Sequence, residues 1–295
     1  MGRLIDELAK GKIMISDGAW GTMLFDKGLK LGECPELWNV THRNDVLDIA
    51  QQYISAGAQM VETNSFGGNS IKLSGFDLDK RAYELNKIAA EISREAAGND
   101  NFVLGSMGPS GKFLVTEEVT EDELIDSFSE QAIALRDGGA DAICIETFYD
   151  LNEAKCAVDA VNKNTDLEVI CTFTFDKQMD DSYRTMMGTS PSEVVEFLVK
   201  NKVDIVGTNC GNGFSGMLEI VSEMRKTNNT IPIIVQANAG LPKLINGISV
   251  YTETPDIMAI EIPKLINAGA NCIGGCCGTT PQHIKRIVIE VNKTL

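Results

Sequence analysis

Eight short runs rich in β-branched residues recur along this chain, and segments with helical periodicity separate them. The runs span Lys12–Ser16, Gln59–Glu62, Phe102–Gly105, Ala142–Glu146, Glu168–Phe173, Val203–Gly207, Pro232–Gln236 and Asn271–Gly274. Alternating strands and helices predict a parallel sheet, and eight repeats suit a closed (β/α)₈ TIM barrel. An open doubly wound sheet is the alternative. No linker or change of composition divides the 295 residues, so we expect residues 1–295 to form one barrel domain.

Local signals indicate where the helices begin and end. Glycines stand just before three of the expected strands, in Ala56-Gly57-Ala58, Gly138-Gly139-Ala140 and Ala268-Gly269-Ala270. Glycine at such a position can adopt the left-handed conformation that closes a helix. Thr120 and Ser190 are each followed three residues later by glutamate. This spacing is typical of a capping box at a helix start.

Charge and hydropathy narrow the classes of partner. The formal net charge is −16, whereas binding to a nucleic-acid backbone or an anionic membrane surface needs clustered lysine and arginine. The first residues contain no apolar signal-peptide core, and no apolar run reaches the roughly 18 residues of a membrane span. We therefore expect a soluble cytoplasmic protein that binds neither nucleic acid nor membrane.

Polar and glycine-rich segments directly follow most of the expected strands. They are Asp17–Thr22, Glu62–Gly67, Gly108–Gly111, Glu146–Phe148, Thr208–Gly211, Asn238–Gly240 and Gly274–Gly278. The longest irregular stretches, Gly18–Thr41 and Gly67–Asp79, also begin where strands end. In a parallel barrel the catalytic residues lie on the loops that follow the strands. These segments are therefore the predicted functional face.

Three of the eight cysteines directly follow expected strands on that face. Cys210 follows the sixth strand, Cys276 and Cys277 follow the eighth, and neighbouring strands are expected to bring them together. Three thiolates are good zinc ligands, and a catalytic zinc keeps one position open. The alternative is a vicinal pair that is redox-active or simply buried. Without an export signal a disulfide framework is not expected, and Cys144, Cys171 and Cys272 lie in apolar runs typical of a core.

The ligand type indicates the chemistry. A zinc ion with three thiolates is a weak Lewis acid for water, but it can bind a fourth thiol as a nucleophilic thiolate. Zinc hydrolases prefer histidine and carboxylate ligands. This chain has only His42 and His283, and neither lies in a zinc-binding motif. The pattern therefore favours alkyl transfer to sulfur.

The same strand ends resemble the homocysteine methyltransferase family in order and over nearly the whole chain. The matching motifs are Asp17-Gly18-Ala19-x-Gly21-Thr22, Glu62-Thr63-Asn64-x-Phe66, Gly108-Pro109-Ser110-Gly111, Glu146-Thr147-Phe148, Gly207-x-Asn209-Cys210-Gly211 and Gly274-Gly275-Cys276-Cys277-Gly278. Asn238-Ala239-Gly240-Leu241-Pro242 is more similar to the homocysteine-binding module of cobalamin-dependent methionine synthase than to other members of the family.

The resemblance implies a site and a reaction. Zn²⁺ would be held by Cys210, Cys276 and Cys277. The homocysteine pocket would be built from Asp17, Gly18, Ala19, Gly21, Thr22, Glu146 and Asn238. Glu146 or Asp17 would bind the substrate ammonium, and the Asn238 carbonyl oxygen would rest on the zinc when substrate is absent. Methylcobalamin on a corrinoid-binding partner protein or domain would supply the methyl group, and methionine would form.

Alternatives remain at this point. The chain could use another thiol or a small donor such as S-methylmethionine or S-adenosylmethionine, or it could be a non-catalytic zinc- or thiol-sensing module. Gly211–Gly216 matches a dinucleotide-binding pattern, but the expected acidic residue is missing and tight packing beside Cys210 is favoured. Asp17 and Glu62 could form an acid/base pair, although substrate orientation is favoured. Trp20, Phe66 and Phe148 are expected either to wall the pocket or to pack in the barrel top.

Overall fold

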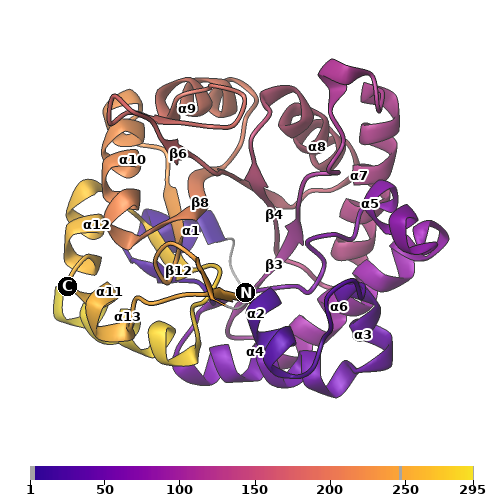
Figure 1. Cartoon of the computed structure of the whole chain (residues 1–295), viewed down its shortest axis with the longest axis horizontal. Helices are drawn as coiled ribbons and strands as arrows, with labels where there is room; N and C mark the ends of the chain where they lie inside the picture. The colour runs from indigo at the N-terminus through magenta and orange to yellow at the C-terminus, as the bar shows by residue number, and fades with distance from the viewer. Residues whose placement is uncertain (1–3, 246–247, 295) are drawn as a thin grey trace.

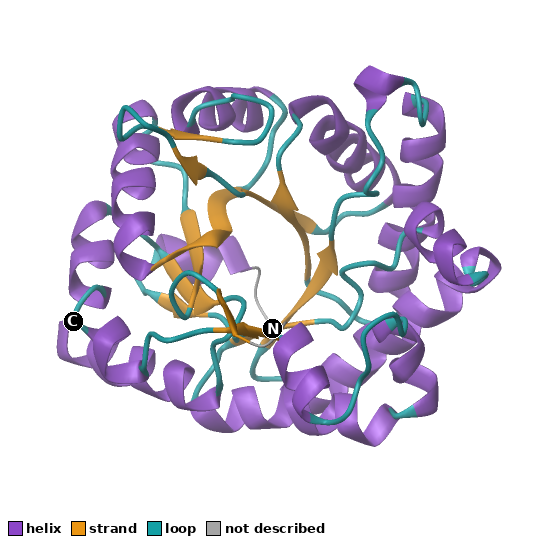
Figure 2. Cartoon of the chain, in the orientation of Figure 1, coloured by secondary structure: helices purple, strands orange, loops and turns teal. Residues whose placement is uncertain are grey.

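A computed structural model describes residues 4–245 and 248–294 and contains a closed parallel barrel. Its strands are β1 (Met14–Ile15), β2 (Met60–Glu62), β3 (Phe102–Met107), β4 (Ala142–Phe148), β5 (Glu168–Phe173), β8 (Ile205–Gly213), β9 (Ile233–Asn238) and β12 (Cys272–Gly275). The sheet order is β1-β12-β9-β8-β5-β4-β3-β2, and a parallel bridge from Ser16 to Met60 joins its two edges. Figures 1 and 2 show the ring of strands inside a ring of helices. The predicted barrel is confirmed, and the open sheet is excluded.

Helices cover the outside of the barrel. They are α1 (Leu4–Ala9), α2 (Gly21–Asp26), α3 (Trp38–Thr41), α4 (Arg43–Ala56), α5 (Ser70–Leu73), α6 (Ala82–Ala97), α7 (Glu121–Asp137), α8 (Leu151–Asn164), α9 (Pro191–Lys200), α10 (Phe214–Thr227), α11 (Pro255–Ala259), α12 (Ile262–Ala268) and α13 (Pro281–Thr294). Short 3₁₀ turns occur at Pro35–Leu37, Ser74–Phe76, Asp79–Arg81 and Leu114–Thr116. Among the helices within the described ranges, none combines the length and apolar character that a membrane span requires.

The predicted helix boundaries are confirmed. Thr120 and Ser190 each accept a hydrogen bond from the third residue of the helix and form complete capping boxes. Gly57, Gly139 and Gly269 have φ between 100° and 105°. A residue with a side chain rarely adopts this conformation, so glycine is required where these helices turn into the following strands.

The hydrophobic core has two layers. The larger layer lies between the strands and the surrounding helices and includes Cys171. The smaller layer fills the inside of the barrel toward the amino-terminal ends of the strands, called here the lower end, and includes Met60, Phe102, Cys144 and Cys272. All three of these cysteines are fully buried, as the apolar runs predicted. A filled lower barrel confines any cavity to the opposite end.

Helix α1 closes the lower end of the barrel. Leu4 and Leu8 pack into the inner layer, and the backbone N–H groups of Leu4 and Ile5 donate to the buried Glu168 carboxylate at the start of β5. Leu4→Ala should therefore lower the free energy of unfolding by about 2–5 kcal/mol, measured by urea denaturation. Leu31 is 88 % exposed, so Leu31→Ala should change it by less than about 0.5 kcal/mol. Equal effects of the two substitutions would contradict this role of α1.

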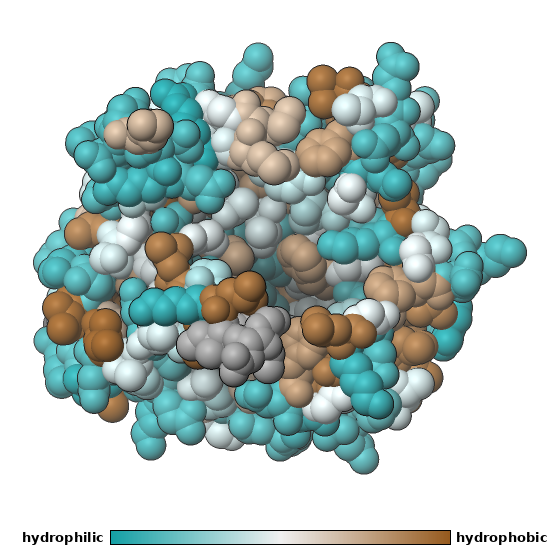
Figure 3. Space-filling model, in the orientation of Figure 1, coloured by the Kyte–Doolittle hydropathy of each residue, from teal (hydrophilic) through white to brown (hydrophobic). Residues whose placement is uncertain are grey.

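Additional segments enlarge the face at the carboxyl ends of the strands. The stretch from Gly18 to Thr41 contains α2 and α3, and the stretch from Gly67 to Asp79 contains α5. Two hairpins were not predicted from the sequence. They are β6–β7 (Asp176–Lys177 with Tyr183–Arg184) and β10–β11 (Lys243–Ile245 with Ile248–Val250). Figure 3 shows the molecule hollowed near the centre of this face.

Candidate metal centre and substrate pocket

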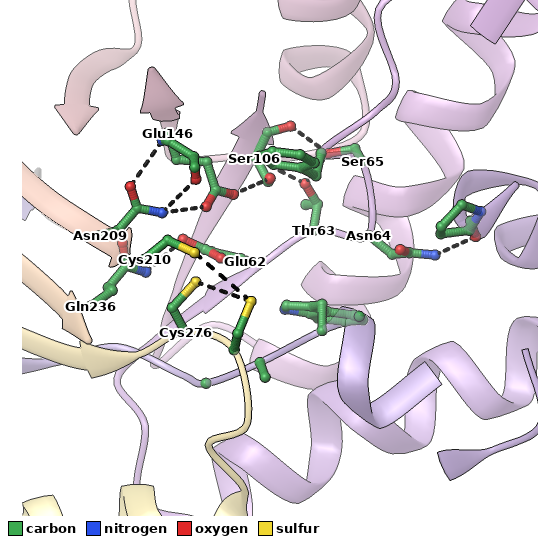
Figure 4. Close-up of a pocket in the computed structure, with 18 of the residues that line it drawn as sticks. Glu62, Thr63, Asn64, Ser65, Ser106, Glu146, Asn209, Cys210, Gln236 and Cys276 are labelled. Carbon is green, nitrogen blue, oxygen red and sulfur yellow. Dashed lines mark hydrogen bonds between the residues drawn. The ribbon is translucent and has the colours of Figure 1, made fainter. Parts of the chain in front are cut away.

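The three predicted cysteines meet at the top of the barrel. The Cys277 Sγ atom lies 3.9 Å from Cys210 Sγ and 4.0 Å from Cys276 Sγ, and all three sulfurs lie within 4.8 Å of one another. Figure 4 shows Cys210 and Cys276 in the wall of the pocket. Strands β8 and β12 are not direct neighbours, because β9 lies between them. The sulfurs therefore meet over the end of β9, which corrects the expectation of neighbouring strands.

The sulfur spacing fits a tetrahedral zinc ion. Two sulfurs bound to one zinc at about 2.3 Å are roughly 3.8 Å apart when the bond angle is tetrahedral. The two shortest separations here are close to that value. A disulfide requires sulfurs about 2.05 Å apart, and all eight cysteines are free. The donor set and its spacing therefore suit a metal that accepts thiolates.

The thiols also differ in their readiness to ionise. Hydrogen bonds from the Cys210 and Cys276 thiols lower the pKa of Cys277 to about 3. In contrast, the hydrogen bonds of the Cys276 thiol with Cys210 and Cys277 raise the pKa of Cys276 well above its usual value. Three crowded thiols cannot all become thiolates unless a cation compensates their charge. A divalent ion with an affinity for sulfur would supply that charge.

Close backbone packing positions the cysteine pair. The N–H of Gly275 donates to the Asp17 carbonyl oxygen at 2.8 Å, and the N–H of Cys276 donates to the Ala237 carbonyl oxygen at 2.7 Å. A Cβ atom on Gly275 would lie 2.2 Å from the Thr279 hydroxyl oxygen. Glycine is therefore needed where β12 passes into the Cys276–Cys277 turn.

Cys210 lies in an irregular part of β8. The register between β8 and β9 shifts between Asn209 and Gly213, and Cys210 has φ of 57°. A left-handed conformation is costly for a residue with a side chain and often marks a functional position. Gly211 has φ of 69°, and a Cβ atom on Gly213 would lie 2.7 Å from the Glu253 carboxylate. The Gly211–Gly216 pattern thus serves tight packing beside Cys210.

Asn238 lies at the end of β9, between residues that bond to the cysteine turn. The N–H of Ala239 donates to the Cys277 carbonyl oxygen at 3.0 Å. The Asn238 side chain is 3 % exposed, and its Oδ1 has no hydrogen-bond partner within the described residues. Buried carbonyl oxygens are normally paired. Within the described residues this oxygen is therefore available to a ligand at the end of β9.

A cavity of about 360 Å³ extends from the three cysteines into the barrel mouth. It is lined by Gly18, Ala19, Trp20, Gly21, Leu24, Pro35, Glu36, Glu62, Thr63, Asn64, Ser65, Phe66, Ser106, Glu146, Thr147, Asn209, Cys210, Gln236, Gly275, Cys276 and Cys277. Most of these residues lie in or just after strands, as the fold requires. The volume is at the lower end of the range for small-molecule sites.

Three buried glutamates line this cavity, namely Glu36, Glu62 in β2 and Glu146 in β4. Gln236 Nε2 donates to Glu62 at 2.6 Å, whereas Glu146 accepts from the Ser106 hydroxyl and, at 3.1 Å, from Asn209 Nδ2. Burial raises the pKa of Glu62 well above its usual value, and the nearby Glu146 carboxylate raises it further. Burial raises the pKa of Glu146 to about 7. Both groups therefore lack a compensating positive charge.

The other predicted pocket residues divide into two groups. Gly18, Ala19, Gly21 and Glu146 line the cavity, whereas Asp17, Thr22 and Asn238 lie outside its lining. Asp17 is fully buried, and its Oδ2 accepts from the Glu62 N–H and the Trp20 indole N–H, both at 2.9 Å. Burial raises the pKa of Asp17 to about 7. In this structure Asp17 joins the first two strand ends behind the cavity wall.

The aromatic expectations also divide. Trp20 and Phe66 line the cavity, but Phe148 is fully buried and packs against Phe128 of α7, with the two rings tilted and their centroids 6.1 Å apart. The expectation of barrel-top packing is therefore confirmed for Phe148 alone. Its direction is set by the irregular end of β4, where Thr147 has φ of 63°.

Two amide side chains of the pocket were not singled out from the sequence. Asn209 immediately precedes Cys210, and its Oδ1 accepts from the Thr147 N–H at 2.9 Å. Gln236 ends the seventh expected strand and donates to Glu62. Their polar character at the ends of buried apolar strands was the available signal, because a polar residue inside such a strand needs partners.

Comparison with known proteins identifies the family of this chain and agrees with its fold. Residues 14–291 match the family model of homocysteine S-methyltransferases. Methionine synthase of Mycobacterium leprae and that of Mycobacterium tuberculosis are each 34% identical over 308 residues, covering 98% of this chain. The chain spans about a quarter of those relatives, since the match covers 25% of each.

A solved structure provides the corresponding fold. The metallated form of the homocysteine methyltransferase MmuM from Escherichia coli superposes with a TM-score of 0.78 at 24% identity. The match covers 96% of this chain and 97% of that one. The family model covers almost all of the barrel. This chain belongs to the homocysteine S-methyltransferase family.

Proposed function

We propose that this barrel, over residues 1–295, binds homocysteine and transfers a methyl group to its sulfur, forming methionine. The observation that supports this best is the cavity itself. It has three sulfurs within 4.8 Å at one end and buried carboxylates in its wall. An amino-acid thiol has the complementary groups, a sulfur that suits a thiophilic metal and an ammonium that suits carboxylates.

Cys210, Cys276 and Cys277 would hold a zinc ion. Bound there, zinc would lower the pKa of the substrate thiol and hold the sulfur as a thiolate that stays nucleophilic. The spacing of the three Sγ atoms supports this ligand set, and the unpaired Oδ1 of Asn238 supports a further ligand when no substrate is present. The three cysteines are therefore assigned to the metal, and Asn238 to its resting state.

The remaining residues would bind and orient the amino acid. Glu146 would accept hydrogen bonds from the substrate ammonium. Ser106 and Asn209 hold the Glu146 carboxylate in place through hydrogen bonds. The Gly18–Gly21 loop would approach the substrate carboxylate with its backbone. Asp17 would act indirectly, because its oxygens already bind Glu62 and Trp20. Thr22 would support the same loop from the first turn of α2.

The methyl donor would approach from outside. A cavity of about 360 Å³ can hold an amino-acid thiol, but it is far too small to enclose a corrinoid. We infer that methylcobalamin is presented at the barrel mouth by a corrinoid-binding protein or domain. Such a donor would supply the methyl group to the sulfur lone pair, the electron pair of the cobalt–carbon bond would stay with the corrinoid, and the thiol proton would pass to solvent.

Methyl transfer from free methylcobalamin tests this proposal. The zinc-loaded protein is expected to convert homocysteine to methionine, measured by mass spectrometry and by the loss of methylcobalamin absorbance. Prior removal of zinc with a strong chelator should reduce the rate to that of buffer alone. If methionine forms with S-methylmethionine or S-adenosylmethionine but not with methylcobalamin, that compound and not the corrinoid is the methyl donor. Tight thiol binding without turnover from any donor would favour a sensing module.

A further inference from the structure

Only one of the two polar groups of the Gln236 side chain has hydrogen-bond partners among the described residues. Gln236 lies in β9, is 1 % exposed and lines the cavity. Its Nε2 donates to Glu62 Oε1 at 2.6 Å and to the Ser16 hydroxyl at 3.4 Å. Its Oε1 is buried and has no hydrogen-bond partner within residues 4–245 and 248–294. Figure 4 shows Gln236 beside Glu62 in the wall of the pocket.

The contact with Glu62 fixes which way the amide points. When Glu62 is ionised, as the pairing with an ammonium requires, rotating the amide by half a turn would place its carbonyl oxygen against the Glu62 carboxylate, where two acceptors repel each other. The Nε2 therefore stays on Glu62, and the Oε1 remains unpaired. A buried carbonyl oxygen without a donor is unfavourable. In the wall of a cavity, the missing donor is most simply a ligand.

Gln131 shows that a buried, unpaired amide oxygen does not by itself indicate a ligand-binding residue. Its Nε2 donates to the Ser65 carbonyl oxygen at 2.8 Å, and its Oε1 is also buried and unpaired within the described residues. Gln131 belongs to α7, however, and does not line the cavity. Position in the cavity wall therefore distinguishes Gln236, and Gln131 provides a matched comparison.

Two buried carboxylates give the cavity beside Gln236 a negative bias. Glu62 and Glu146 line the same cavity, and neither forms a salt bridge with a lysine or arginine of the described residues. Their mutual repulsion is part of the reason that the pKa of Glu62 is raised. A primary ammonium has three N–H donors and one positive charge. It would pair both carboxylates and the free carbonyl oxygen.

We propose that Gln236 Oε1 is the third acceptor for the ammonium of the substrate, beside Glu62 and Glu146, and that it selects amino-acid thiols over thiols without an amino group. This inference rests on the proposed function, because it takes homocysteine as the thiol. Gln236 has a second role as a positioning residue, since its Nε2 holds the Glu62 carboxylate in place. An N-alkylated substrate would lose one donor and bind less well.

A comparison of two thiols tests the inference. Homocysteine and γ-mercaptobutyrate, which is homocysteine without its amino group, are titrated into zinc-loaded protein by calorimetry. The wild type should bind homocysteine more tightly. Gln236→Met keeps the length of the side chain, and it should weaken homocysteine binding about tenfold or more while changing γ-mercaptobutyrate binding less than about twofold. Gln131→Met should leave the ratio of the two affinities unchanged.

A second variant and the binding of both thiols by the wild-type protein complete the test. Glu62→Gln should reduce the preference for homocysteine in the same direction, and it replaces Gln236→Met if that variant does not fold. A wild-type protein that binds both thiols equally, or variants that lose both equally, would overturn the inference while leaving thiol binding intact. A wild type that binds neither thiol would overturn the proposed function, and the inference with it.

Discussion

Alanine in place of Cys210, Cys276 or Cys277 is expected to remove most of the bound zinc and all measurable methyl transfer. Each sulfur lies within 4.8 Å of the other two, so each substitution deletes one of three metal ligands. Loss of hydrogen-bond partners outside a metal's ligand shell already weakens binding roughly 10- to 100-fold. Loss of a ligand should therefore weaken zinc binding more than about 100-fold, measured by competition with a chromophoric chelator.

Cys156→Ala is the matched control for these variants. Cys156 is also a buried free cysteine, but it lies in α8 on the outside of the barrel. This variant should keep its zinc content and its rate of methyl transfer. Circular dichroism and thermal melting would establish that all four variants fold. A folded Cys210→Ala, Cys276→Ala or Cys277→Ala protein that retains zinc and activity would remove that residue from the ligand set.

Glu146→Ala is expected to keep the zinc and to weaken homocysteine binding. The Glu146 carboxylate is held by Ser106 and Asn209 in the cavity wall and has no lysine or arginine partner among the described residues. Hydrogen bonds to charged groups contribute about 1.5–3 kcal/mol, which corresponds to roughly 10- to 150-fold in the dissociation constant. Calorimetry with homocysteine measures the affinity, and metal analysis measures the zinc.

The control is another buried carboxylate of the same barrel. Glu153 is 2 % exposed and accepts hydrogen bonds from the backbone and hydroxyl of Ser110, but it does not line the cavity. Glu153→Gln should therefore leave homocysteine affinity unchanged. Unchanged binding in Glu146→Ala, or equal losses in the two variants, would remove Glu146 from the substrate pocket.

The sequence predicted the barrel because its local signals agree with one another. The run from Glu168 to Phe173 matches β5 residue for residue, since an uninterrupted β-branched and apolar run has no competing interpretation. By contrast, the run from Val203 to Gly207 underestimates β8, which continues to Gly213. That extension passes through Gly211, and glycine-rich sequence normally indicates a turn. The β10–β11 hairpin was missed because its two strands are only three residues long and lie within a segment that the sequence predicts as a loop.

The sequence also predicted which cysteines meet, although not how. The order of strands in a parallel barrel brings the ends of β8 and β12 to the same face. The predicted strand order already places the seventh strand between them, but the sequence did not reveal that Cys210 has a left-handed backbone. Side-chain directions were the least predictable feature. Asp17 and Glu62 both lie at the ends of strands, yet only Glu62 lines the cavity, because the Glu62 N–H and the Trp20 indole hold Asp17 behind the wall.

X-ray absorption at the zinc edge tests the central claim most directly. The protein is loaded with one zinc per chain, and the spectrum is recorded before and after homocysteine is added. The account predicts three sulfur ligands at about 2.3 Å and one nitrogen or oxygen ligand in the free protein, changing to four sulfur ligands with homocysteine. Zinc with fewer than three sulfur ligands, or a spectrum that homocysteine leaves unchanged, would contradict it.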